Sequence, residues 1–214
     1  PDISDRQRLF EIWAVIVTAI GKFIFMDYLQ LRFLFIVVTI IFWTIYIIIR
    51  KNVLPQILFY WGFRQDNLVQ ASKLVLPFGL VAIMFFVVIG YFQDTLNLTW
   101  HIVPILILYP IWGIIQQFLV IGLIAGNLKD MKSVRLHHAL IVLFTALLFG
   151  LLHAPYTWLI LGTFLLAIFY GIIYLRERNL YVLGLLHGWL GGLFFYTVVE
   201  RDPFIEVFGK YLNL

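Results

Sequence analysis

The sequence predicts an all-α membrane protein, a polytopic bundle of about seven transmembrane helices with the N-terminus inside and the C-terminus outside. Hydrophobic residues make up 63% of the 214 residues and charged residues only 12%, whereas soluble domains average about 45–50% apolar and about 25% charged residues. Long stretches lack charge altogether, and the basic residues gather in alternate connecting segments. So much apolar surface must face lipid, which excludes a soluble globule. The absence of cysteine also excludes disulfides and thiolate metal sites.

Five stretches without Asp, Glu, Lys or Arg define most of the expected elements. They are Phe33–Ile49, Leu74–Gln93, Thr95–Leu128, Leu136–Leu175 and Asn179–Val199. Because a helix needs about 20 apolar residues to cross the hydrocarbon core, Leu136–Leu175 must contain two crossings and each of the others one. We place its division at His153-Ala154-Pro155, since proline disfavours helix in the residue before it and is tolerated in the first turn of a new helix.

Two further segments near the N-terminus are apolar but interrupted. Leu9–Met26 contains Glu11 and Lys22, so it either crosses the membrane or lies at the interface as an amphipathic helix. Val53–Phe63 is expected to be an interfacial segment because it contains proline and aromatic residues next to charged ones. Counting Leu9–Met26 as a crossing gives seven spans.

The basic residues predict the orientation. With the N-terminus inside, eleven Lys and Arg residues lie in inner segments and three in outer ones, as expected because cytoplasmic loops carry the excess of positive charge. We therefore predict an integral protein of a bacterial-type inner (cytoplasmic) membrane. No basic stripe indicates a nucleic-acid partner. The expected organisation is N-terminal transmembrane helices and an interfacial segment over residues 1–99, a helical core over 100–200 and a C-terminal tail over 201–214.

Few polar side chains occur at membrane depth, and these are the candidate functional residues: Gln116, Gln117, His153 and His187. Lipid makes such groups costly, so they are expected to face the interior of the bundle. Gln116 and Gln117 point about 100° apart on a helix, and the simplest role for either is an interhelical hydrogen bond worth on the order of 1 kcal/mol. Two histidines from different helices could also converge on a metal, a water or a tetrapyrrole.

Three short motifs, in order along the chain, resemble those of the CPBP family of CAAX prenyl endopeptidases, also called Abi or bacteriocin-processing proteins. Phe149-Gly150-Leu151-Leu152-His153 has the form F-x-x-x-H, and the run from Tyr174 to Tyr181 leads to a final histidine at His187. The segment Gln116–Gly122 stands where that family has E-E-x-x-x-R. The resemblance covers roughly residues 104–196.

The resemblance implies an intramembrane endopeptidase, in which the first glutamate and the F-x-x-x-H histidine activate a water and a final H-x-x-x-N motif stabilises the oxyanion. Carried over to this sequence, the catalytic positions are Gln116, His153 and His187. The other motif positions are Gln117 for the second glutamate, Ile121 for the arginine, Phe149 for the phenylalanine and Gly191 for the asparagine.

Four of these positions, Gln117 among them, depart from the family pattern, and three of the departures matter most. Gln116 cannot accept a proton, Ile121 carries no charge and Gly191 has no side-chain amide. Because a general base contributes about 10²–10⁴ in rate and one oxyanion-hole donor about 10²–10³, we predict a degenerate, proteolytically inactive member. It would act as a binding or scaffolding subunit whose partner is another membrane protein, a lipidated or hydrophobic peptide, or membrane lipid, without a cofactor.

Two alternatives remain open. In the first, the protein is an active CAAX-type endopeptidase with a non-standard site, where His153 and His187 hold a metal that lowers the pKa of its water to about 7, although catalytic zinc usually takes three protein ligands. In the second, the protein is a subunit of a membrane complex that ligates a pigment or haem through one of these histidines. Elemental analysis and an absorption spectrum distinguish these alternatives.

Overall fold

The computed structural model describes residues 1–213, and over this range it is helical without a strand, which confirms the predicted all-α class. Three of the helices continue without a break into π-helical segments, labelled η. The elements are α1 (Asp5–Gly21), η1 (Lys22–Tyr28), α2 (Arg32–Val53), α3 (Ile57–Trp61), α4 (Leu68–Gln93), α5 (Ile102–Gln117), η2 (Phe118–Ala125), α6 (Gly126–Asp130), α7 (His138–Leu151), α8 (Thr157–Arg176), α9 (Leu180–Phe194), η3 (Phe195–Val199) and α10 (Pro203–Leu212).

Six helical segments of the described chain are long and apolar enough to cross a membrane. Leu9–Met26 lies within one of them, the 24-residue segment Asp5–Tyr28. The long stretch Leu136–Leu175 divides where proline predicted it, between the end of α7 at Leu151 and the start of α8 at Thr157. The expected fifth span is α7, which has only 14 residues. The count of seven spans and their orientation therefore stay predictions.

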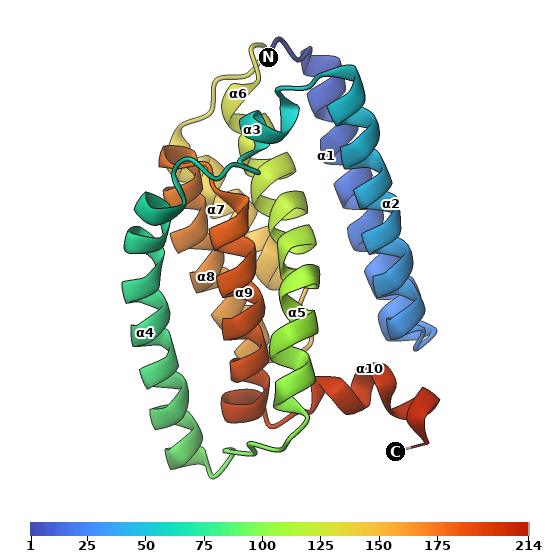
Figure 1. Ribbon diagram of the computed structural model, residues 1–214, viewed down its shortest axis with the longest axis vertical. Helices are drawn as coiled ribbons and strands as arrows, with labels where there is room; N and C mark the ends of the chain where they lie inside the picture. The colour runs from blue at the N-terminus through green and yellow to red at the C-terminus, as the bar shows by residue number, and fades with distance from the viewer. Residues whose placement is uncertain (214) are drawn as a thin grey trace.

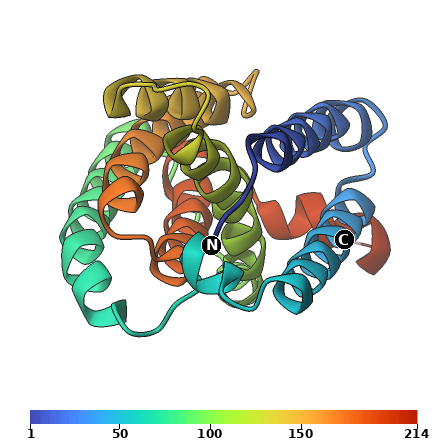
Figure 2. The same ribbon diagram turned by 90° about the horizontal axis from the view of Figure 1, so that it is seen from above.

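The helices form a core and a separate hairpin. Figures 1 and 2 show α1 and α2 side by side along one flank, α5 and α9 in the centre, and α4, α7 and α8 around the remaining sides. The N-terminus, α3 and α6 lie at one end of the bundle, and α10 lies across the opposite end (Figure 1).

The segment 201–214, expected only as a tail, contains α10. Asp202 caps this helix, since its side chain accepts hydrogen bonds from the backbone N–H groups of Phe204 and Ile205. Pro203 occupies the first turn, where the missing N–H costs nothing. The helix packs against α2 and α5, so it connects the hairpin to the core.

Small residues bring α5 and α9 into close contact. A Cβ atom at Gly184 would lie 2.5 Å from the Cα of Ile114, and one at Gly113 would lie 2.6 Å from the carbonyl oxygen of Gly184. Side chains at these positions would therefore force the helices apart, and glycine lets the two backbones touch. This packing places Gln116 of α5 opposite His187 of α9.

A buried polar network fastens the hairpin at the N-terminal end of the bundle. The carboxylate of Glu11 is fully buried and accepts hydrogen bonds from Tyr46 Oη at 2.7 Å and from Asn127 Nδ2 at 2.7 Å. Arg8 donates to Asn127 Oδ1 at 3.2 Å and to Tyr60 Oη at 2.5 Å. Because buried charges are tolerated only when they are paired and hydrogen-bonded, this network fixes α1 against α2, α3 and α6.

Candidate functional site

Gln116 and His187 form a direct hydrogen bond between α5 and α9. Nε2 of His187 lies 3.0 Å from Oε1 of Gln116, and since an amide oxygen only accepts, the imidazole donates through Nε2. The neutral ring then has an unprotonated Nδ1, which is buried without a partner among residues 1–213. His187 is 4% exposed. The bond gives Oε1 of Gln116 a neutral partner, as expected for a polar contact inside a membrane bundle.

His153 lies in the turn that follows α7, and its ring is also oriented by a hydrogen bond. Nδ1 donates to the carbonyl oxygen of Phe149 at 2.8 Å, which leaves Nε2 as the acceptor of a neutral ring. The phenyl ring of Phe149 contacts both histidines, with centroid distances of 5.0 Å to His153 and 5.5 Å to His187. The predicted neighbours Gln116, Phe149, His153 and His187 are thus gathered in one place.

The length of α7 explains how the two histidines meet. A helix of 14 residues is about 21 Å long, which is shorter than the hydrocarbon core of about 30 Å. The turn that carries His153 is level with the middle of α9, because Phe149, one turn before His153, also contacts His187.

A cavity of about 150 Å³ opens between the α1–α2 hairpin and the core. Its inner wall includes Gln116, His153 and Phe149, whereas His187 lies behind Gln116 and does not line it. Apolar and aromatic side chains form most of the remaining wall: Val15, Ala19, Met26, Phe35, Tyr109, Trp112, Leu119, Val120, Leu152, Tyr156, Leu159 and Phe195.

All three π-helical segments contribute to this cavity. Lys22, Met26 and Asp27 come from η1, Leu119 and Val120 from η2, and Phe195 from η3. Such segments widen a helix locally and occur frequently at functional sites. Their convergence on one cavity marks this region as the candidate functional site.

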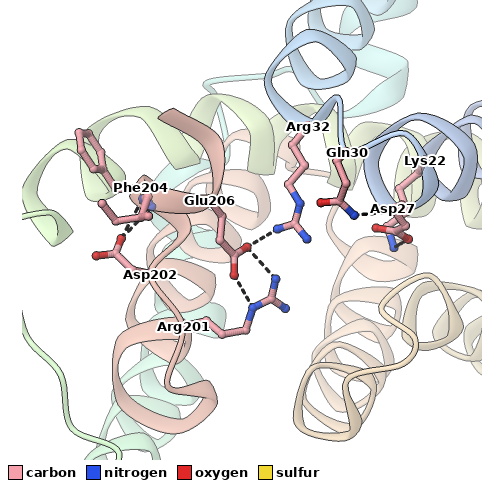
Figure 3. Close-up of polar contacts among 9 residues, drawn as sticks. Lys22, Asp27, Gln30, Arg32, Arg201, Asp202, Phe204 and Glu206 are labelled. Carbon is pink, nitrogen blue, oxygen red and sulfur yellow. Dashed lines mark hydrogen bonds and ion pairs between the residues drawn. The ribbon is translucent and has the colours of Figure 1, made fainter. Parts of the chain in front are cut away.

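Charged residues that the sequence analysis did not assign to a site also line the cavity. They are Lys22, Asp27, Arg32, Arg201 and Glu206. Lys22 Nζ lies 2.6 Å from Asp27 Oδ2, and Glu206 accepts hydrogen bonds from both Arg32 and Arg201 (Figure 3). Lys22 could have been found from the sequence, because it is a charge within an apolar stretch. Glu206 could not, because its place at the cavity depends on how α10 packs.

The other motif positions lie away from the cavity. Gln117 is 1% exposed, and neither atom of its amide has a partner within residues 1–213. Ile121 is fully buried within η2. Gly191 faces Tyr109, because a Cβ atom there would lie 2.9 Å from the tyrosine ring. Of the four departures from the family pattern, only the one at Gln116 lies at the cavity itself.

The histidines have neutral partners. Within residues 1–213 neither His153 nor His187 hydrogen-bonds to a carboxylate, and both carboxylates that line the cavity, Asp27 and Glu206, pair with cations. Over the same range no three His, Asp or Glu side chains are grouped closely enough to hold one metal ion. The inner wall can therefore donate and accept hydrogen bonds, but it offers no carboxylate for proton transfer.

One comparison with known proteins gives a match. Residues 95–193 match the family model described as Rce1-like, type II CAAX prenyl endopeptidase. The match includes Gln116, Phe149, His153 and His187, and it confirms the resemblance predicted from the motifs. No curated protein and no solved structure matches the chain.

Proposed function

We propose that the chain, whose residues 95–193 match the Rce1-like family model, is a proteolytically inactive membrane protein of this family, which binds a hydrophobic ligand or partner segment in the cavity between the hairpin and the core. The observation that carries this proposal is the hydrogen bond between Gln116 and His187. The amide of Gln116 is neutral, and it stands at the position for which the resemblance implies a catalytic glutamate.

The chemistry of the inner wall supports inactivity. Peptide hydrolysis needs a group that takes a proton from water, and the amide of Gln116 cannot do so. His187 uses Nε2 to bond Gln116, so this nitrogen does not donate to an oxyanion while the bond is made. Losing a general base and an oxyanion donor removes about 10⁴–10⁷ in rate, by the ranges for each separately.

The cavity itself supports binding. Its wall is mostly apolar and aromatic with a few convergent polar groups, which is the usual composition of a ligand site. It lies between helices of a membrane protein, so its ligands are expected to come from the membrane: a lipidated peptide, a segment of another membrane protein, or a lipid. The protein would do this in a bacterial-type inner membrane.

A metal ion or tetrapyrrole held by His187 is disfavoured by the same geometry, because Nε2 of this ring bonds Gln116 and its Nδ1 is buried within the bundle. The Nδ1–H group of His153 bonds the carbonyl oxygen of Phe149, so of the two rings only His153 keeps a nitrogen, Nε2, for a ligand. A catalytic zinc ion usually takes three protein ligands. An absorption spectrum and elemental analysis of the purified protein test both alternatives.

Proteolysis of a prenylated CAAX peptide by the purified protein in lipid nanodiscs tests the proposal. We expect no product above the buffer rate, and no difference between the wild-type protein and His153→Ala. The Gln116→Glu variant is a matched probe, because it restores only the carboxylate. Wild-type turnover that is lost in His153→Ala would refute the proposal and favour an active enzyme with a non-standard site.

A further inference from the structure

The charged mouth of the cavity carries more positive than negative charge. Three cations line it, Lys22, Arg32 and Arg201, against the two carboxylates of Asp27 and Glu206. Lys22 and Asp27 neutralise each other at 2.6 Å. Arg32 and Arg201 share one carboxylate, that of Glu206, so one guanidinium charge is left without a counter-ion (Figure 3).

Hydrogen-bond donors are also left over. Arg201 donates to Glu206 through Nε and a terminal nitrogen, and its guanidinium stacks 3.9 Å from the ring centroid of Tyr156. Arg32 donates to Glu206 through one terminal nitrogen only, and makes no other hydrogen bond within residues 1–213. Because a guanidinium carries five N–H donors, most of those on Arg32 are free to bind an oxyanion.

The position of the mouth indicates which anion is within reach. It lies beside α10, which crosses the end of the bundle (Figure 1). Two aromatic side chains are exposed there: Trp100, whose ring packs against Phe204 of α10, and Tyr211 of α10. Such residues gather at the membrane–water interface. At the membrane–water interface the abundant anions are the phosphates of lipid headgroups. The charged mouth and the apolar wall belong to the same cavity.

We infer that the cavity binds an anionic phospholipid, with its phosphate at Arg32 and Arg201 and an acyl chain along the apolar wall toward Gln116 and His153. This inference rests on the proposed function, because it names the ligand class of the same cavity. Guanidinium groups form charge-assisted bonds with the phosphate of any phospholipid, but the unbalanced positive charge disfavours a headgroup that carries its own cation. The site therefore selects anionic lipid, and Glu206 opposes this selection by occupying the same two arginines.

Trp112 lines the cavity and so reports on an acyl chain inside it. The assay titrates lipids with brominated acyl chains, which quench tryptophan on contact, into the purified protein. The signal of Trp112 is the difference between the wild-type protein and Trp112→Phe. We expect phosphatidylglycerol to quench Trp112 at a mole fraction about tenfold lower than phosphatidylcholine with the same chains, because the unbalanced guanidinium charge repels the choline cation.

Two substitutions at the mouth are expected to act in opposite directions. Arg32→Gln removes the unbalanced charge and should reduce the preference for phosphatidylglycerol to about twofold or less. Glu206→Gln frees both arginines and should raise that preference. If the Arg32–Glu206 contact served only to hold α2 against α10, both variants would change quenching in the same direction, and that result would overturn the inference. Arg64→Gln is the control, since Arg64 pairs with Asp66, away from the cavity.

The remaining outcomes are also decisive. Equal quenching of Trp112 by both lipids would refute the headgroup selection, while the proposal of an inactive binding protein would stand. Absence of Trp112 quenching by either lipid would overturn the inference as well. Displacement of phosphatidylglycerol by inorganic phosphate alone would mean that the mouth recognises a free anion and not a lipid.

Discussion

Replacing Gly188 with alanine should separate α5 from α9 and break the contact between Gln116 and His187. A Cβ atom at Gly188 would lie 2.6 Å from the backbone nitrogen of Pro110. The obstacle is backbone, which cannot rotate away as the end of a side chain can, so the helices must move apart by roughly 1 Å to reach van der Waals contact. The Gln116–His187 bond of 3.0 Å would then exceed the length of an effective hydrogen bond.

The expected loss of stability follows from three terms. Overpacking costs about 1–3 kcal/mol, and the lost hydrogen bond about 1 kcal/mol. Alanine gains about 1 kcal/mol over glycine in a helix interior, which offsets the hydrogen bond. The free energy of unfolding of Gly188→Ala should therefore fall by about 1–3 kcal/mol.

Unfolding in mixed detergent micelles, followed by circular dichroism, measures this difference. Gly122→Ala is the matched control, because the nearest atoms to a Cβ there would be side-chain atoms, at 3.3 Å and 3.4 Å, and the backbone oxygen of Gln117 lies at an ordinary contact distance of 3.9 Å. It should remain within about 1 kcal/mol of the wild-type protein. Equal stability of the two alanine variants would refute the reasoning that backbone contact between α5 and α9 positions the site.

Two further predictions concern the polar contacts at the two ends of the bundle. Asn127→Ala removes a donor to the buried carboxylate of Glu11. The free energy of unfolding in the same micelles should therefore fall by about 1–3 kcal/mol. An unchanged value would mean that the network does not hold α1 in place. Burial alone would raise the pKa of Asp202, but hydrogen bonds with His101 and Tyr196 hold it below its ordinary value of 3.8. The contribution of Asp202 to the docking of α10 should therefore be fully present above pH 3.8 and be lost as the pH falls through the lowered pKa. Limited proteolysis of α10 would detect this change. Asp202→Asn should remove this dependence on pH.

Much of the fold was predictable because lipid imposes a simple rule on the sequence. Uncharged stretches marked the long helices, and Pro155 marked the turn between α7 and α8. The helix α10 was not predicted, because its stability depends on tertiary contacts and on a cap at Asp202. The shortness of α7 was also missed, since hydropathy shows where a stretch is apolar and not where its helix ends.

The candidate site was predictable in its inner wall and not at its mouth. Gln116, His153 and His187 were found because polar groups at membrane depth are rare. Arg32 and Glu206 are far apart in sequence and unremarkable as loop residues, so only the packing of α10 against α2 identifies their pairing. Gln117 was an equally good candidate, because it too is a polar residue at membrane depth. Its side chain points about 100° away from that of Gln116 on the helix and is buried inside the bundle.

If α7 is the predicted fifth span, its 14 residues create a local hydrophobic mismatch on one side of the protein. Lipids that border a helix of about 21 Å must shorten their chains or leave polar groups of the turn uncovered, each at a fraction of a kcal/mol per ångström. A thin bilayer should therefore suit this face, and a thick, ordered one should exclude the protein. Bilayer thickness then becomes a physical variable that controls where the protein resides and how readily headgroups approach His153.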